Sequence, residues 1–214
     1  MNNLQKYTLC FCLLLTASFY SQEQWELVKE DQGIQVYTRL NEVMSFKEFK
    51  ASMVVTANMN DFLSVLYDVE GLVSWGHNIE EVRLLDRPSD SIQIYYAIAK
   101  APWPYKNRDG IYKNVFSWDK LHEILVVDIT MLDKEMDPEK KYVRMAGYGN
   151  WTATKMSGTE LQIEFQMQVD PGGSIKAWMA NMFVTDSPYY TMEGMRKALS
   201  KKKYQGKSYE LLSN

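Results

Sequence analysis

The sequence has few of the residues from which catalytic and metal sites are usually built. It contains two histidines, His77 and His122, and two cysteines in 214 residues. No cluster of histidine, cysteine and carboxylate has a metal-ligand spacing, so we interpret both histidines as ordinary surface or core residues and expect no metal or other cofactor. The chain also lacks a Gly-x-Ser-x-Gly turn and a phosphate-binding loop, which argues against serine-hydrolase and nucleotide-dependent chemistry.

Both cysteines, Cys10 and Cys12, lie in an N-terminal segment that differs from the rest of the chain. Lys6 gives this segment a short positive region, residues 9–15 form an apolar run, and small residues follow. That pattern is typical of a secretory signal peptide. The competing interpretation is a membrane anchor, but the apolar run is much shorter than the roughly 20 residues that a spanning helix needs.

We therefore predict a signal peptide over residues 1–21 and a single domain over residues 22–214, secreted or periplasmic after cleavage. The mature chain would have no disulfide and no thiol chemistry. The formal net charge is only −3, and the one basic cluster is Lys201-Lys202-Lys203. Such a cluster suits the negative end of a helix, with contact to an anionic membrane as the weaker alternative. We expect no nucleic-acid partner.

The mature sequence is dominated by strands that lie between two helical regions. A short helix is expected over Glu23 to Glu30, and a second helix, capped by Asn58 to Asn60, follows two early strands at 34–39 and 46–55. Further strands are expected at 82–85, 91–99, 110–118, 123–131, 142–155 and 159–169. The connections are too short for crossover helices, so the pattern predicts an antiparallel sheet in an α+β fold, wrapped around a final helix.

The final helix should begin after Asp170-Pro171-Gly172-Gly173, with Ser174 as its cap, and carries one apolar stripe. The stripe recurs at i, i+3, i+4, i+7 and i+8, at Ile175, Trp178, Met179, Met182 and Phe183. It can simply cover the sheet, or its soft Met-rich and aromatic surface can line a site for an apolar ligand. We expect an interruption at Asp186-Ser187-Pro188, where Pro188 can start a renewed helix.

Alternation along two strands predicts which side chains face the interior. Leu161, Ile163, Phe165, Met167 and Val169 alternate with Gln162, Glu164, Gln166 and Gln168, which predicts one buried face and one wet face. The same test on residues 92–98 places Ile94, Tyr96 and Ile98 inside and Gln93 in solvent.

The most informative polar motif begins at the stiff turn Pro102-Trp103-Pro104 and ends at Arg108-Asp109. Because neighbouring strand residues point to opposite faces, one of this charged pair must meet the apolar interior, where it needs a partner. Arg108 can bond backbone carbonyls and hold the turn, or it can grip the polar end of a ligand.

Several motifs, taken in order, resemble the START family of lipid-binding domains over roughly Trp25 to Tyr204. They are Gly33-Ile34-Gln35-Val36-Tyr37, Trp75, Pro102-Trp103-Pro104 before Arg108-Asp109, Val143-Arg144-Met145 before Trp151, and Asp170-Pro171-Gly172-Gly173 with Trp178 and Asn181. The resemblance implies a helix-grip fold, in which a curved antiparallel β-sheet wraps around a long C-terminal α-helix. It also implies an internal apolar cavity that holds one lipid or sterol-like molecule.

One position departs from the family pattern. In some members a carboxylate on the strand before the Pro-x-Pro turn faces the buried arginine, and the corresponding residue here is Ile98. Either another group meets Arg108 or a ligand phosphate or carboxylate does. The second case would favour an acidic headgroup over a sterol hydroxyl.

We therefore predict a protein that binds a lipid or other hydrophobic small molecule, with lipid transport between membranes as one role and without catalysis. The expected partners are that ligand and, transiently, a membrane surface, and we expect a monomer. Face and motif select these ligand-binding residues: Tyr96, Trp103, Arg108, Arg144, Trp178, Met179, Met182 and Phe183.

Two alternatives remain open from the sequence. The first is a helix-grip enzyme, of cyclase or hydrolase type, that acts on an apolar substrate. It would need an acid or base in the cavity, and the candidates are Asp128, Glu164 or a tyrosine. The second is a filled core, in which case no pocket of roughly 300 Å³ or more would exist and the domain would be an interaction module.

Overall fold

The fold is described from a computed structural model, which covers residues 24–41, 44–132, 136–137 and 139–213. The side chains of residues 41, 44–45, 177–180 and 182–183 lie outside the described part. The expected signal peptide over residues 1–21 also lies outside it and stays a prediction. Among the described residues, no helix combines the length and the apolar character that crossing a bilayer requires.

The described residues form ten strands and two α-helices, with short 3-10 turns between them. The strands are β1 (Glu26–Asp31), β2 (Ile34–Asn41), β3 (Met44–Thr56), β4 (Ile79–Ser89), β5 (Ile92–Ala99), β6 (Arg108–Asp119), β7 (Ile124–Leu132), β8 (Val143–Arg144), β9 (Ala146–Lys155) and β10 (Glu160–Asp170). The helical segments are α1 (Met59–Tyr67), η1 (Glu70–Ser74), α2 (Ala177–Leu199), η2 (Lys202–Tyr204) and η3 (Glu210–Leu212).

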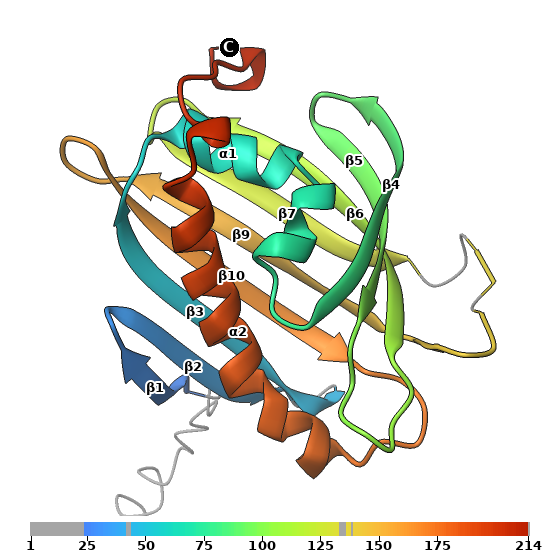
Figure 1. The fold of residues 1–214 in the computed structure, drawn as a ribbon. Coiled ribbons are helices and arrows are strands. Elements are labelled where there is room, and N and C mark those ends of the chain that lie inside the picture. The colour runs from blue at the N-terminus through green and yellow to red at the C-terminus, as the bar shows by residue number, and fades with distance from the viewer. Residues whose placement is uncertain (1–23, 42–43, 133–135, 138, 214) are drawn as a thin grey trace, which may run out of the picture.

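All ten strands belong to one sheet, with the order β1-β2-β3-β10-β9-β7-β6-β5-β4 and with β8 attached to β6. Every pairing in the main path is antiparallel, and only the short β8–β6 pairing is parallel. Figure 1 shows the sheet curving around α2, while α1 contacts α2 and β9 and η1 contacts β4. The predicted α+β helix-grip fold is confirmed.

The early helix forms where its cap was expected. The side chain of Asn58 accepts a hydrogen bond from the backbone N–H of Asp61 at 2.9 Å, which satisfies one of the free donors at the start of α1. Phe62, Leu63 and Leu66 on this helix are buried in the core. The helix therefore packs its apolar face against the sheet, as its spacing predicts.

The helix expected over Glu23 to Glu30 is wrong, because part of this segment is strand β1. The turn between β1 and β2 has Gln32 at φ 49° and Gly33 at φ 71°, and the two strands then pair from Glu26↔Thr38 to Asp31↔Ile34. A short segment with few apolar residues can form a helix or a strand. Here it is a strand because it pairs with β2 at the edge of the sheet.

Helix α2 runs without interruption from Ala177 to Leu199, with Pro188 inside it and Lys176, rather than Ser174, at its cap position. The expected break at Asp186-Ser187-Pro188 is wrong. Proline removes one backbone donor from a helix, but packing along the rest of the helix can hold it continuous. Tyr189, Met192 and Met195 follow in the buried core, which provides that packing.

The alternation along β10 is confirmed for its apolar side. Leu161, Ile163 and Met167 are buried in the main core, and Phe165 packs against it. Gln168 differs from the expectation, because it is fully buried and accepts a hydrogen bond from the Tyr148 hydroxyl at 2.7 Å. A buried amide is tolerated when it is hydrogen-bonded.

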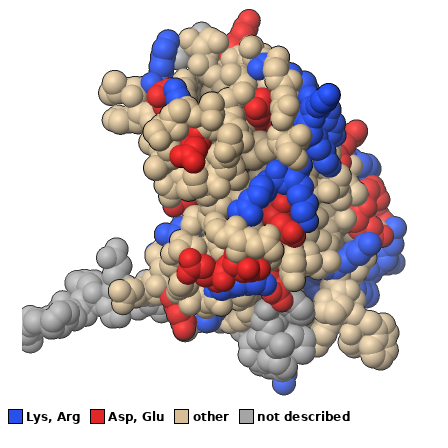
Figure 2. Space-filling view, turned by 60° about the vertical axis from the view of Figure 1, so that its left-hand side comes forward, with Lys and Arg blue, Asp and Glu red and all other residues tan. Residues whose placement is uncertain are grey.

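On the face shown in Figure 2, basic and acidic side chains are interspersed.

Candidate functional site

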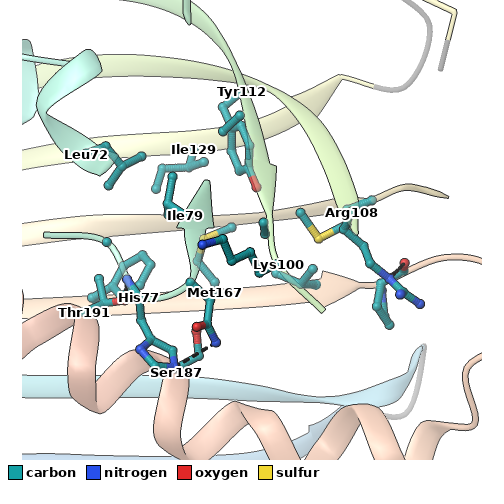
Figure 3. A pocket seen from close by; sticks show the side chains of 18 of the residues that line it. Leu72, His77, Ile79, Lys100, Arg108, Tyr112, Ile129, Met167, Ser187 and Thr191 are labelled. Atoms are coloured by element: carbon teal, nitrogen blue, oxygen red, sulfur yellow. Dashed lines mark hydrogen bonds between the residues drawn. The ribbon is translucent and has the colours of Figure 1, made fainter. Parts of the chain in front are cut away.

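A cavity of about 570 Å³ lies inside the curve of the sheet, closed by α2 on one side and by η1 and the loop that follows it on another. Most of its wall is apolar, as Figure 3 shows for Leu72, Ile79, Ile129 and Met167. This volume lies within the range of roughly 300–1,000 Å³ that is typical of small-molecule sites. A cavity of this size argues against the filled-core alternative.

Strands β5 and β6 build one wall from residues that alternate toward the cavity. The facing cross-strand pairs are Gln93↔Asn114, Tyr95↔Tyr112, Ala97↔Gly110 and Ala99↔Arg108. The wall thus has an amide pair at one end, then two tyrosines, then a small pair that leaves room, and finally a cation at the other end. The amide end lies near Leu66 and Asp68 at the end of α1, and the cation end lies near Pro102 and Pro171.

The tyrosine pair is stacked and desolvated. The rings of Tyr95 and Tyr112 lie 5.0 Å apart with planes only 8° from parallel. Burial raises the pKa of both hydroxyls well above the ordinary value, so both stay protonated at neutral pH. Figure 3 shows the Tyr112 hydroxyl pointing into the cavity. A neutral hydroxyl at this position can donate to or accept from a ligand.

Two buried polar atoms on the cavity wall have no hydrogen-bond partner among the described residues. They are Oδ1 of Asn114 and Nε1 of Trp75. Both side chains are more than nine-tenths buried. Buried polar atoms in native proteins are nearly always paired, so such atoms in a cavity indicate groups that a ligand or water can satisfy.

Arg108 is the charged residue at the other end of this wall, and its side chain is buried as the motif predicts. Its Nε donates to the carbonyl of Pro171 at 3.3 Å, and its Nη1 donates to the carbonyl of Lys106. No carboxylate of the described residues forms an ion pair with it. Burial lowers the pKa of this guanidinium, an effect opposed by Tyr105, but an arginine stays protonated in a protein. The wall therefore carries a buried cation whose charge is not neutralised.

The neighbouring Asp109 faces the other side of the sheet and is occupied there. Its carboxylate accepts hydrogen bonds from Nε and Nη2 of Arg144 at 3.1 and 2.9 Å, and from the Tyr96 hydroxyl at 3.2 Å. The structure thus brings Arg144 and Tyr96 together, but neither lies on the cavity wall. Both had been expected to bind the ligand, and their position on the opposite face argues against that role.

The face of β5 toward the cavity differs from the expected one. Gln93 is buried on the cavity wall rather than in solvent, and Ile94, Tyr96 and Ile98 form a second apolar cluster with Ile111 on the far face. Because both faces of this strand are covered, its two sets of residues are both apolar and alternation cannot tell them apart. Both polar atoms of the Gln93 amide have a partner, since Oε1 accepts from Arg87 at 3.0 Å and Nε2 donates to the carbonyl of Leu66 at 3.0 Å.

Trp103 does not line the cavity either. It is 93% exposed at the tip of the turn between β5 and β6, while its neighbour Pro102 is the residue that touches the cavity. Tryptophan side chains are rarely so exposed, and an exposed one often marks a contact surface.

The remaining expected ligand-binding residues lie on the first turns of α2. The side chains of Trp178, Met179, Met182 and Phe183 fall outside the described part, so their role stays a prediction. Their helix does border the cavity, because Ile175 just before it and Asn181 and Val184 within it are wall residues. Asn181 also accepts a hydrogen bond from the backbone N–H of Lys47 at 2.8 Å, which ties the helix to β3.

Sequence reasoning missed a group of polar wall residues between the η1–β4 loop and α2. They are His77, Asn78, Lys100, Asp186, Ser187 and Thr191. The backbone N–H of His77 donates to Thr191 Oγ1 at 3.2 Å, and the His77 ring stacks on Tyr190 at 5.0 Å. Burial lowers the pKa of His77, and the charge of Asp186 opposes this shift. These residues come from three separate segments, so no local pattern could have grouped them.

The acidic groups of the cavity are already paired. Asp68 accepts hydrogen bonds from Lys203 and Tyr204, both at 2.8 Å, and Asp186 pairs with Lys29 at 3.0 Å. Of the expected candidate acids and bases, Asp128 is exposed and Glu164 points away with Gln162, whereas two tyrosines, Tyr95 and Tyr112, do lie on the wall. Within the described part of the chain, no group of three or more potential ligands could hold a metal ion.

Comparison with known proteins gives a consistent result. The START domain family model matches residues 11–204. An uncharacterized protein of Pseudomonas aeruginosa is 28% identical over 182 residues, which cover 84% of this chain and 89% of that protein. Phosphatidylcholine transfer protein of Bos taurus is 27% identical over 195 residues, which cover 87% of this chain and 89% of that protein.

Solved structures share the same fold. A STAR-related lipid transfer protein from Xanthomonas axonopodis is 30% identical and superposes with a TM-score of 0.77, covering 83% of this chain and 99% of that one. Human STARD10 is 23% identical with a TM-score of 0.73, covering 83% of this chain and 74% of that one. At this lower identity the second likeness shows the fold alone.

Proposed function

Because the chain belongs to the START domain family, whose members bind lipids or other hydrophobic ligands, we propose that its cavity binds one lipid with an acidic headgroup and carries it between membranes. The observation that carries this proposal is Arg108, a buried cation on an apolar wall with backbone carbonyls as its hydrogen-bond partners. A phosphate or carboxylate is the complement of such a guanidinium, since it offers charge and several acceptors.

The energetics favour a charged amphiphile over a purely apolar one. Burying an uncompensated charge is costly, so an acidic headgroup against Arg108 would relieve a cost already present in the empty protein. Each methylene of the chain would add about 0.8 kcal/mol as it leaves water. The bovine relative carries the name of a phosphate-containing lipid, phosphatidylcholine, which supports a phosphate or carboxylate at this position.

The transport part of the proposal rests on the exposed turn between β5 and β6. Trp103 at its tip is 93% exposed, and it adjoins Pro102 on the cavity wall. Tryptophan favours the interface between headgroups and acyl chains, because its ring is apolar and its N–H is polar. We expect this turn to touch a membrane while the ligand enters or leaves. The N-terminal pattern supports action outside the cytoplasm, which fractionation of the host would test.

No catalytic step is part of the proposal. A hydrolase or cyclase needs a positioned acid or base against its substrate. The carboxylates on the wall, Asp68 and Asp186, are held by Lys203 and Lys29. The relatives from Bos taurus and Xanthomonas axonopodis are also named for lipid transfer rather than for catalysis.

The test is a binding panel with delipidated protein. Palmitate and lysophosphatidate present an anionic carboxylate or phosphate, while monopalmitoylglycerol and cholesterol present only hydroxyl groups. We expect the acidic lipids to bind tightest, and Arg108→Met to weaken them by about tenfold or more, since hydrogen bonds to a charged group contribute roughly 1.5–3 kcal/mol. Arg83→Met is the matched control, because Arg83 is half-exposed and lies over Tyr96 on the other face.

Two outcomes would contradict the proposal in different ways. Equal affinity for all four lipids, or an unchanged affinity in Arg108→Met, would overturn the acidic headgroup. Failure of every lipid to bind would overturn lipid binding itself.

A further inference from the structure

The cavity has a second polar end, which the acidic headgroup does not use. Asn114 lies on the same face of β6 as Arg108, six residues further along the strand, so the two side chains are separated by roughly 20 Å at about 3.3 Å per residue. Its side chain is 5% exposed, and its Oδ1 has no hydrogen-bond partner among the described residues. This acceptor is therefore both buried and unsatisfied.

No side chain next to Asn114 makes a hydrogen bond to its Oδ1 among the described residues. Gln93, directly opposite on β5, uses its Nε2 on the carbonyl of Leu66 and its Oε1 on Arg87. Tyr95 lies next to it on the same wall. Burial raises the pKa of the Tyr95 hydroxyl and a hydrogen bond from the Asn114 side chain opposes this rise, so the amide N–H group, rather than Oδ1, faces that hydroxyl. The Oδ1 remains as an open acceptor beyond the stacked tyrosines.

An open acceptor at the end of an apolar cavity discriminates between ligands. A ligand that brings a hydroxyl to this end would satisfy Oδ1, whereas a plain hydrocarbon end would leave it buried without a partner. Arg108 at one end and Asn114 at the other line the same cavity, which is one small-molecule site of about 570 Å³. The two ends together specify a single-chain molecule with polar groups at both ends.

We propose that the cavity selects an amphiphile that carries a hydroxyl near the end of its chain, with Asn114 Oδ1 as the acceptor of that hydroxyl and Arg108 at the acidic head. This inference rests on the proposed function, because it uses Arg108 to fix the direction of the chain. It adds a specificity-determining residue and a substrate class, the terminally hydroxylated acidic lipids.

Three fatty acids of one length test the inference by calorimetric titration of the delipidated protein. They are palmitate, 2-hydroxypalmitate and 16-hydroxypalmitate. We expect 16-hydroxypalmitate to bind about fivefold to tenfold tighter than palmitate, as one buried hydrogen bond gives, and 2-hydroxypalmitate to show no such gain. In Asn114→Leu, which keeps the branched shape of the side chain but removes the amide, 16-hydroxypalmitate should lose its advantage over palmitate.

Asn150→Leu is the matched control, because Asn150 lies on β9 next to the wall residue Trp151 but points away from the cavity. It should keep the preference for 16-hydroxypalmitate. Equal binding of the three acids to the wild type would overturn the inference while leaving the proposed function intact. A preference that survives in Asn114→Leu would overturn the role of Asn114, and failure of all three acids to bind would overturn both proposals. Thermal melting of each variant identifies any loss of folding.

Discussion

Arg144 holds the carboxylate of Asp109 with two hydrogen bonds, from Nε to Oδ1 at 3.1 Å and from Nη2 to Oδ2 at 2.9 Å. The side chains are 10% and 1% exposed, so this is a buried, bidentate ion pair on the outer face of the sheet. The ion pair holds Asp109, the carboxylate that follows Arg108 in the sequence, on the outer face and away from the cavity. The charge of Arg108 is thereby left for a ligand.

The first prediction concerns the stability that this ion pair contributes. Asp109→Leu and Arg144→Met should each lower the free energy of unfolding by about 3–5 kcal/mol, because each leaves a buried charge without its main partner. The double variant should be more stable than either single variant, since it removes both charges. Urea unfolding of the three proteins measures this. Additive losses in the double variant would show that the two residues do not act as a pair.

A second prediction concerns the packing of α2 on the loop after η1. A Cβ atom added at Gly194 would lie 2.0 Å from the backbone oxygen of Trp75, so Gly194→Ala must push the helix away. We expect a loss of about 1–3 kcal/mol in the free energy of unfolding, although alanine favours helices. Lys197→Ala, on an exposed part of the same helix, should change stability by less than about 0.5 kcal/mol. A stabilised Gly194→Ala protein would contradict this close approach.

The pH dependence of stability gives a third prediction. Burial holds the pKa of His77 below its ordinary value of 6.5 in the folded protein. The unfolded chain therefore binds more protons in the window below pH 6.5, so the contribution of His77 is fully present above that pH and is lost as the pH falls. The free energy of unfolding should fall less between pH 7 and pH 5 in His77→Gln than in the wild type. His122→Gln, on an exposed turn, is the control, and identical profiles for His77→Gln and the wild type would contradict the prediction.

A fourth prediction separates membrane contact from ligand binding. Trp103→Ala should slow lipid transfer between vesicles several-fold, because the exposed ring no longer enters the membrane interface. Lipid affinity and the melting temperature should stay unchanged, since the side chain does not line the cavity. Leu121→Ala is a suitable control, because Leu121 is 85% exposed in the turn at the opposite end of β6. Equal transfer rates for the two variants would contradict a special role for this turn.

The fold followed from the sequence wherever local chemistry and long-range packing agree. Asn58 caps α1, and the alternation of Leu161, Ile163 and Met167 places β10 with its apolar face inward. The sequence also predicted that one of Arg108 and Asp109 faces the interior, because neighbouring strand residues point to opposite faces, and the structure places Arg108 on the cavity wall.

The sequence-based predictions were wrong where both faces of a strand carry similar residues, or where segments that are distant in the sequence determine which residues meet. Both faces of β5 are covered, so Tyr96 looked as suitable for the cavity as Tyr95. Trp103 is apolar and lies in a stiff turn, yet nothing local tells whether such a turn folds inward or projects. His77, Lys100 and Thr191 meet only because the sheet curves around α2, and that curvature has no local signal.

The most direct test of the account is native mass spectrometry of the mature protein, expressed with its own N-terminal segment in its host and purified without detergent, with bound molecules extracted and identified in parallel. The account predicts one molecule of an acidic lipid per chain, lost or strongly reduced in Arg108→Met and retained in Arg83→Met. A bare wild-type protein that also takes up no lipid from the panel would contradict it.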